Sequence, residues 1–142
     1  MKILHIAEFG LRKTGIGTVV ERLHKEQSLL GYDVRIATTS ENKAYKHLDI
    51  SNVSNPKSLT LLLGEWTPDV VIFHSIWCMS YIKMAKILKD RNIPYAVMMH
   101  GANSVENYKK NKLKKWVANT LFFNKFLREA ATIVYLSKKE YE

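Results

Sequence analysis

The sequence predicts an α/β fold in which a parallel sheet is covered on both faces by helices. Three observations along the 142 residues predict it. Short apolar segments alternate with longer segments that have the residue spacing of a helix. Most of the short segments are apolar throughout, which is typical of strands that are buried on both faces. Glycine or proline stands between most neighbouring segments, as expected for the tight connections of strand–helix–strand units.

The first strand–helix–strand unit is expected within residues 2–39. Residues 2–9 are apolar and predict a buried strand, which the three glycines of residues 10–17 bring to an end. From Thr18 a helix is expected, because residues recur at steps of three and four. These residues are Ile16, Val20, Leu23, Gln27 and Leu30. Gly31 stands where a glycine commonly ends a helix, and residues 32–39 alternate as a second strand.

The remaining elements follow an irregular polar stretch, residues 40–57, which has room for one short element. In order, we expect a helix over 58–66, a strand over 69–75, a helix with Tyr81, Met84, Ala85 and Leu88 on its inner face, a strand over 92–101, a helix over about 105–130, a strand over 131–137 and the start of a helix over 138–142. Pro68 ends the first of these helices, because the residue before a proline disfavours the helical conformation.

Composition places the chain among globular proteins. It is 46% hydrophobic and 25% charged, and its length suits one domain with a sizeable core. The single cysteine, Cys78, excludes an internal disulfide and fits a reducing compartment. No apolar run approaches the roughly 18 residues that a membrane-spanning helix needs. We therefore expect a cytoplasmic protein, with at most peripheral attachment to the inner face of the membrane.

The net charge of +9 predicts an anionic partner, such as nucleic acid, an acidic membrane surface or a phosphorylated small molecule. Nucleic acid is disfavoured, because the lysines cluster on one expected helix with no recognition motif beside them. On that helix Phe122 and Phe126 fall off the apolar stripe and beside Lys115. This arrangement favours contact with a membrane or with another part of the protein. The alternative is that an intramolecular neighbour covers both aromatic rings.

Candidate ligand-binding residues follow from the rule that open parallel sheets bind ligands beyond the carboxyl ends of their strands. The rule selects residues 9–17, 38–41, 74–77 and 100–103, and Ser137. In the first of these loops, Gly15 and Gly17 stand at a helix start, where backbone N–H groups can approach a phosphate. The motif is not a complete nucleotide fingerprint, because position 20 is valine. Glycines that serve only a tight turn are therefore the alternative.

His100 is the candidate for chemistry at a strand end. An imidazole titrates near neutral pH, so His100 can act as a general acid or base, or donate a hydrogen bond to a substrate hydroxyl. Gly101 beside it favours a functional role over the alternative, in which the ring only caps a backbone carbonyl. His74 occupies the equivalent place on another strand. No cluster of His, Cys or carboxylate residues has metal-ligand spacing, so no metal is expected.

Five segments in order resemble the N-terminal half of glycosyltransferase family 4 enzymes, which have the GT-B fold. They are the glycines after the first strand, GYDV at 31–34, PDVVIFHS at 68–75, IPYAVMMHG at 93–101 and ATIVYLSKKEYE at 131–142. The resemblance extends over essentially the whole chain. It implies that residues 1–142 form one Rossmann-like domain, the acceptor-side member of two domains that face each other across a cleft.

The resemblance also implies a function and assigns residues to it. The expected enzyme is a retaining transferase that moves a hexose from a nucleotide-sugar donor to an acceptor. The resemblance places His100 at the transferring sugar as the catalytic residue. The residues at the donor diphosphate are then Gly15, Gly17, Thr14 and Gly101, and those on the acceptor side are His74, Ser75, Asn103 and Ser137. No metal or other cofactor is implied.

The chain departs from the family pattern in two respects. Thr14 stands where the family often has the first glycine of a Gly-Gly pair. The C-terminal donor-binding domain is absent, so we expect this chain alone to be inactive and to need that domain or a separate donor-binding subunit. The expected acceptor is a glycan or a lipid-linked molecule of cell-surface polysaccharide biosynthesis. The alternatives are a stand-alone basic α/β module that binds nucleotides or nucleic acid, and a non-catalytic subunit of a split transferase.

Overall fold

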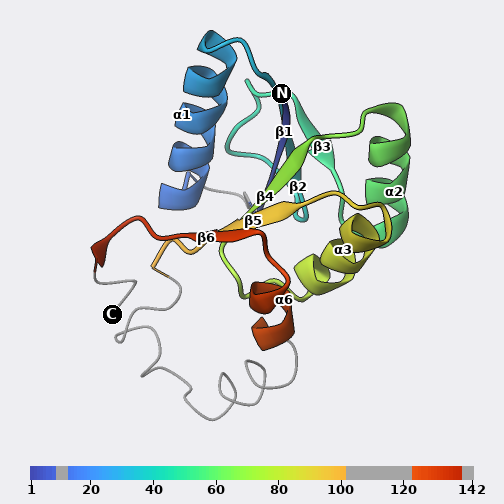
Figure 1. The fold of residues 1–142 in the computed structure, drawn as a ribbon. Helices are drawn as coiled ribbons and strands as arrows, with labels where there is room; N and C mark the ends of the chain where they lie inside the picture. Colours follow the sequence, from blue (N-terminus) through green and yellow to red (C-terminus); the bar gives the residue numbers. More distant parts are fainter. Residues whose placement is uncertain (9–12, 102–122, 139–142) are drawn as a thin grey trace.

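The computed structural model describes residues 1–8, 13–101 and 123–138, and these contain one six-stranded sheet (Figure 1). Its strands are β1 (Lys2–Ala7), β2 (Asp33–Thr38), β3 (Ile50–Asn52), β4 (Val70–His74), β5 (Tyr95–Met98) and β6 (Thr132–Val134). Their order is β3-β2-β1-β4-β5-β6, and every neighbouring pair is parallel. The predicted parallel α/β sheet is therefore confirmed. Because all strands run the same way, their carboxyl ends meet at one edge.

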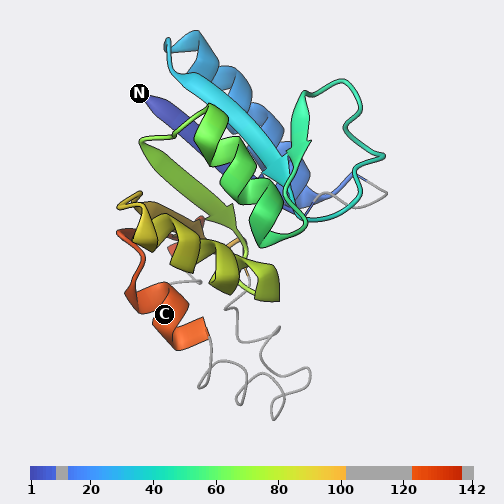
Figure 2. The same cartoon turned by 90° about the vertical axis from the view of Figure 1, so that its right-hand side faces the viewer.

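Helices cover both faces of the sheet (Figures 1 and 2). They are α1 (Gly15–Leu29), α2 (Pro56–Glu65), α3 (Met79–Asp90) and α6 (Asn124–Arg128). In Figure 2 the helices α2, α3 and α6 lie in front of the sheet, whereas α1 lies behind it. The buried apolar residues form two clusters accordingly, and the larger one includes residues of α2, α3, α6 and the strands beneath them. No helix in the described part of the chain is long and apolar enough to cross a membrane.

Local sequence explains where α1 and α2 begin and end. Thr14 caps α1, because its side-chain oxygen accepts a hydrogen bond from the Gly17 N–H at 3.0 Å. Gly31, with φ of +84°, follows the C-terminus of α1 as predicted. The helix expected over 58–66 begins earlier than predicted, since Asn55 and Ser58 form a capping box and Pro56 suits the first helical position.

The structure corrects the prediction for Phe126. Its side chain is only 2% exposed, so it is not a surface for a membrane or another protein part. The Phe126 ring stacks on that of Tyr95, with centroids 5.3 Å apart, and the Tyr95 hydroxyl donates to the Phe126 carbonyl at 2.6 Å. The alternative reading, an intramolecular neighbour over the ring, is therefore right for this residue. Lys115 and Phe122 lie outside the described residues, as does most of the helix predicted over 105–130.

Candidate functional site

The strands β4 and β5 end in turns with unusual backbone geometry. Ser75 follows β4 with φ of +74°, and His100 and Gly101 follow β5 with φ of +51° and +72°. Non-glycine residues rarely adopt positive φ, and where they do they often mark functional sites. Glycine adopts the positive φ of position 101 without the strain that a side chain would bring. The Ser75 N–H donates to the Met98 carbonyl at 2.8 Å, which ties the two strand ends together.

Three imidazoles form a hydrogen-bonded row, from His5 within β1 through His74 at the end of β4 to His100 in the turn after β5. Nδ1 of His5, in β1, lies 2.9 Å from Nε2 of His74, and Nδ1 of His74 lies 2.8 Å from Nε2 of His100. The far nitrogen of His5, Nε2, lies 2.8 Å from Oε1 of Gln27 in α1. We call His5, His74, His100 and Gln27 the histidine row. The row joins the interior of the sheet to its carboxyl edge.

Burial sets the charge of the inner part of the histidine row. His5 and His74 are 0% and 1% exposed. Loss of water around each ring lowers the pKa of His5 and lowers that of His74 well below the usual value of 6.5. The neighbouring histidines lower the His74 pKa further, because two adjacent imidazolium ions repel each other. Both inner rings are therefore neutral at physiological pH.

The hydroxyl of Tyr81 fixes the backbone beside the row. It lies 3.1 Å from the His74 carbonyl oxygen and 3.4 Å from that of Ile6, and it donates to the nearer one. Burial raises the pKa of Tyr81 well above 10, so the hydroxyl stays protonated and remains a donor. The end of β4 is thus held both through its backbone and through the ring of His74.

The N-terminus of α1 is the second part of the site. Tyr45, which is fully buried, lies beneath it, and its hydroxyl makes two hydrogen bonds of 3.1 Å with the N–H and the carbonyl of Thr14. A Cβ atom on Gly17 would lie 2.4 Å from the Tyr45 hydroxyl oxygen, whereas one on Gly15 would meet nothing within 4 Å. The two glycines therefore serve different purposes.

This difference corrects the prediction that Gly17 lies against a diphosphate. Gly17 is buried, its N–H is used by the Thr14 side chain, and its missing side chain leaves space for Tyr45. By contrast, the N–H groups of Gly15 and Ile16 donate to no acceptor among the described residues. They are two of the N–H groups that a helix N-terminus leaves without an intrahelical partner.

A pocket of about 370 Å³ brings the two parts of the site together. It is lined by Thr14, Gly15, Ile16, Val19, His100 and Leu136. The pocket lies at the carboxyl edge of the sheet, where open parallel sheets bind ligands. It combines a helix N-terminus, which attracts anions, with an imidazole, which exchanges hydrogen bonds with hydroxyl groups.

The residues that were predicted to lie on the acceptor side differ in their exposure to solvent. His74 does not line an acceptor surface, because its ring is buried and both of its nitrogens face other histidines, so that prediction is wrong for its side chain. Ser75 is half-buried beside His74, and Ser137 is exposed after β6. Asn103 lies outside the described residues. Among the described residues, no group of three or more His, Cys, Asp or Glu side chains is placed to hold a metal ion.

Sequence reasoning did not select His5, Gln27 or Tyr45. The signal for His5 was a lone imidazole inside an otherwise apolar strand, and Gln27 stood at a position of the helical stripe that is usually apolar. Tyr45 lay in a polar loop with no periodicity to indicate its burial. Each residue gains its role from a partner far away in the sequence.

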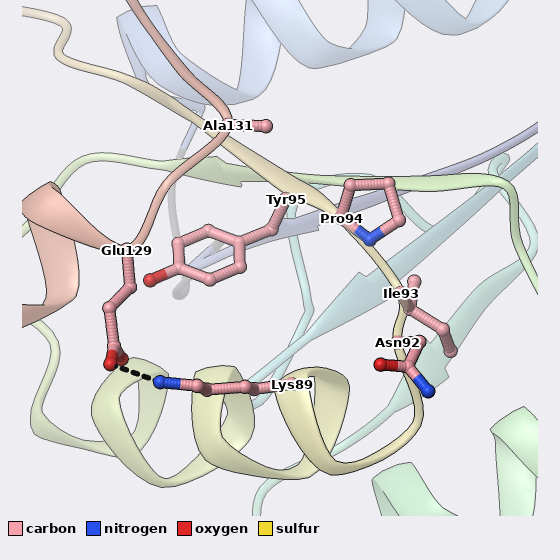
Figure 3. A pocket seen from close by; sticks show the side chains of 7 residues that line it. All are labelled: Lys89, Asn92, Ile93, Pro94, Tyr95, Glu129 and Ala131. Carbon is pink, nitrogen blue, oxygen red and sulfur yellow. Dashed lines mark hydrogen bonds and ion pairs between the residues drawn. The ribbon is translucent and has the colours of Figure 1, made fainter.

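A larger cavity, of about 650 Å³, lies at the opposite edge of the sheet, beside the amino ends of β5 and β6 (Figure 3). Figure 3 shows the ring of Tyr95 between Ala131 and the ion pair of Lys89 with Glu129. The two charged groups neutralise each other, and no group on its wall lies at a carboxyl strand end. We therefore assign the functional site to the smaller pocket.

Comparisons with known proteins agree with the fold. The sequence model of glycosyltransferase family 4 matches residues 13–142. An α-glucosyltransferase solved with UDP and a 13-mer DNA containing an HMU base is similar in structure, with a TM-score of 0.63 and 19% identity over 95% of this chain and 37% of that one. The α-glucosyltransferase AGT in complex with UDP gives a TM-score of 0.62 and 17% identity over 95% of this chain and 35% of that one.

A third solved structure is the UDP-GlcNAc 2-epimerase from Neisseria meningitidis bound to UDP-GlcNAc. Its TM-score is 0.53, with 14% identity over 78% of this chain and 35% of that one. At these identities the likeness shows a common fold. No curated protein matches in sequence. The chain spans little more than a third of the length of the solved structures that it resembles.

Proposed function

The chain belongs to glycosyltransferase family 4, and on that premise we propose that it is the acceptor-side domain of a retaining sugar transferase. The donor is a nucleotide-sugar, and the acceptor is a glycan or a lipid-linked molecule in cell-surface polysaccharide biosynthesis. One observation carries the proposal. The N-terminus of α1 and His100 at the end of β5 line the same pocket, so an anion and a sugar can be bound side by side.

In the proposed complex, the donor diphosphate lies against the N-terminus of α1. The N–H groups of Gly15 and Ile16 lie at this end of the helix, and the helix dipole adds a favourable interaction with negative charge. Open space around Gly15 lets phosphate oxygens approach the backbone closely. The Thr14 side chain maintains this geometry by capping the helix.

The transferring sugar lies beside His100 in this proposal. As the sugar–phosphate bond breaks, positive charge develops on the sugar ring, and a neutral imidazole can hold a hydroxyl of that ring in a fixed orientation. Ser75, which follows β4, and Ser137, which lies beyond β6, are the proposed acceptor contacts, and Asn103 remains an acceptor-side candidate from the sequence. No metal ion takes part, because the helix N-terminus stabilises the leaving diphosphate.

A second domain, or a separate subunit, completes the proposed cleft. The chain covers 37% of the α-glucosyltransferase and 35% of the epimerase that it resembles, and both were solved with a UDP-containing ligand. We propose that the donor nucleotide binds mainly to that second part. On this account the chain alone does not transfer sugar.

Peripheral attachment to the inner, anionic face of the membrane is also part of the proposal. Lys83 and Lys86 lie along one side of α3 and are exposed, and Lys125 and Arg128 on α6 are exposed as well. Such a basic surface is attracted to anionic lipid and less so as salt increases. We expect the chain to sediment with vesicles that contain phosphatidylserine and to be released by salt. Equal sedimentation with neutral vesicles would refute the electrostatic attachment.

The test of the proposed function is the substitution His100→Asn in the enzyme completed by its donor-binding domain. Asparagine adopts positive φ more readily than most residues, so the turn after β5 is preserved while the imidazole is lost. We expect transfer from a panel of nucleotide-sugars to fall by about 100-fold or more. The matched control is His47→Asn, because His47 is exposed, pairs with Glu21 and does not line the pocket. Turnover within about twofold of the unchanged enzyme would contradict the proposal.

A further inference from the structure

Tyr45 supports the N-terminus of α1 from inside the protein. It belongs to the segment between β2 and β3, residues 39–49, and its side chain is fully buried. Its hydroxyl accepts a hydrogen bond from the Thr14 N–H and donates one to the Thr14 carbonyl, both at 3.1 Å. A hydroxyl can make both bonds at once, because it carries a proton as well as lone pairs. One side chain therefore holds both backbone polar groups of the residue that caps α1.

The backbone of Tyr45 is itself held in place. Its N–H donates to the side-chain oxygen of Asn42 at 3.0 Å, and its carbonyl accepts from the Asn42 side-chain amide at 3.2 Å. The Leu48 N–H donates to the same carbonyl at 3.1 Å. The ring packs in the smaller of the two apolar clusters, which joins α1 to β1 and β2. Tyr45 is therefore a fixed support rather than a side chain that follows the movements of the helix.

Thr14 transmits this support to the first turn of α1. Its side-chain oxygen accepts from the Gly17 N–H, and its carbonyl accepts from the Thr18 N–H, each at 3.0 Å. The Tyr45 ring also occupies the space that a side chain at position 17 would need. Thr14 and the two residues after it line the pocket, whereas Tyr45 does not. Tyr45 thus fixes one wall of the pocket from behind.

We propose that Tyr45 is a positioning residue that sets the affinity of the α1 N-terminus for an anion. The inference rests on the proposed function, in which the donor diphosphate lies at the N–H groups of Gly15 and Ile16. Donors that already point in the required directions bind an anion more tightly, because binding does not have to order them. Tyr45 acts through Thr14, by keeping the first turn of α1 in its binding conformation before the ligand arrives.

Tyr95 provides a matched comparison for this role. Its buried hydroxyl also donates to a backbone carbonyl, that of Phe126, at 2.6 Å. It stands at the amino end of β5, whereas the pocket lies at the carboxyl edge of the sheet. Tyr45→Phe and Tyr95→Phe each remove a buried hydroxyl and keep the ring, so both should lower the free energy of unfolding. Only Tyr45→Phe should change the N-terminus of α1.

Titration of the ¹⁵N-labelled chain with inorganic pyrophosphate measures the affinity of the α1 N-terminus for an anion. In the unchanged chain, the backbone amide signals of Gly15 and Ile16 should move as pyrophosphate is added. In Tyr45→Phe the Kd should rise by about 3- to 10-fold, the effect of a hydrogen bond of ordinary strength. In Tyr95→Phe it should stay within about twofold of that of the unchanged chain. A Kd that is the same in Tyr45→Phe as in the unchanged chain would overturn the proposal.

Amide hydrogen exchange tests whether the effect passes through Thr14. The N–H groups of Gly17 and Thr18 both donate to Thr14. Amides near a helix terminus exchange by local opening, so a lower global stability alone does not speed their exchange. Tyr45→Phe should therefore accelerate exchange at these two amides, and Tyr95→Phe should not. The same exchange rates in both variants would show that the Tyr45 hydroxyl does not position the first turn.

Steady-state kinetics of the enzyme completed by its donor-binding domain separate positioning from folding. Tyr45→Phe should raise the KM for the nucleotide-sugar and leave the KM for the acceptor unchanged. A variant that only folds less well contains less active enzyme, so it lowers the apparent kcat and changes neither KM. A KM for the nucleotide-sugar that stays unchanged in Tyr45→Phe would contradict the positioning role.

The pyrophosphate titration also separates this inference from the proposed function. If the Gly15 and Ile16 signals of the unchanged chain do not move, the placement of the donor diphosphate is rejected, and the role of Tyr45 in anion binding is rejected with it. If they move and the Kd is the same in Tyr45→Phe, the role of Tyr45 alone is rejected, and the proposed function stands.

Discussion

An alanine at position 17 would place a methyl group against the buried ring of Tyr45. The added Cβ atom would lie 2.4 Å from the Tyr45 hydroxyl oxygen and 2.5 Å and 2.6 Å from two ring carbons. Ordinary contact begins near 3.4 Å, so the ring has to retreat by about 1 Å. Tyr45 is fully buried, and its hydroxyl bonds both the N–H and the carbonyl of Thr14, so this movement strains the N-terminus of α1.

The expected cost of Gly17→Ala follows from these contacts. Crowding a packed interior costs about 1–3 kcal/mol, and each of the two hydrogen bonds to Thr14 contributes about 0.5–1.5 kcal/mol. Alanine favours the helix over glycine by at most about 1 kcal/mol, which offsets part of the loss. We therefore expect the free energy of unfolding to fall by about 1–5 kcal/mol, with a central value near 3.

Urea titrations of two matched pairs measure this cost. Gly17→Ala is compared in the unchanged chain and in a Tyr45→Leu background, where the crowding ring is absent. We expect a cost below about 0.5 kcal/mol in that background, because the methyl group then finds space. Gly15→Ala is the control two residues away, and it should leave stability nearly unchanged because nothing lies within 4 Å of its Cβ. Equal costs of Gly17→Ala in both backgrounds would falsify the packing role of Gly17.

Three further predictions concern pH, the interior and metal. The free energy of unfolding should fall as pH drops below about 6.5, since burial lowers the pKa of His5 and His74 and the unfolded chain then binds more protons. In urea titrations from about pH 7.5 to about pH 5.5, the free energy of unfolding should fall by at most about 1.4 kcal/mol per pH unit for each of these two histidines. A free energy of unfolding that does not change with pH would contradict the burial of both rings in the neutral form. Tyr95→Phe should cost about 1–3 kcal/mol in the same assay, because the Phe126 carbonyl loses its donor, and no loss would show that water replaces it. Treatment with EDTA should leave sugar transfer by the completed enzyme unchanged, whereas a loss that Mg²⁺ or Mn²⁺ restores would contradict the metal-free mechanism.

The strands of the sheet could be predicted from the sequence because each one is a short apolar segment that can be recognised without knowing its neighbours. Every predicted strand appears, and the buried segments around β4 and β5 are found where proline and glycine bounded them. The predicted boundaries of the elements were less accurate where a side-chain hydrogen bond determines the end of a helix. The start of α2 depends on the bond between Asn55 and Ser58, which spacing of apolar residues does not reveal.

The histidine row could not be predicted, because it depends on the order of strands in space. His5 and His74 are 69 residues apart and meet because β4 pairs with β1, while β2 and β3 lie on the other side. The alternation of residues along a strand predicts on which face of the sheet each side chain lies, but it does not predict which strands are neighbours in the sheet. For the same reason sequence selected His74 and His100 as separate candidates and gave no sign that their rings touch.

The error at Phe126 has a related cause. The prediction placed it on a single long helix and judged its exposure from that helix alone. The described part of this segment, α6, instead packs Phe126 against Tyr95 of β5 and Tyr81 of α3. The partner rings lie on separate elements, so exposure was decided by tertiary contacts rather than by the spacing within one helix.

The most direct test of the central claim is a structure of the completed enzyme with an intact nucleotide-sugar. It should show the diphosphate at the N–H groups of Gly15 and Ile16. It should also show a hydroxyl of the sugar within about 2.7–3.2 Å of the His100 ring. A sugar bound away from His100, or a diphosphate bound away from the N-terminus of α1, would contradict the assignment of this pocket to the donor and its transferring sugar.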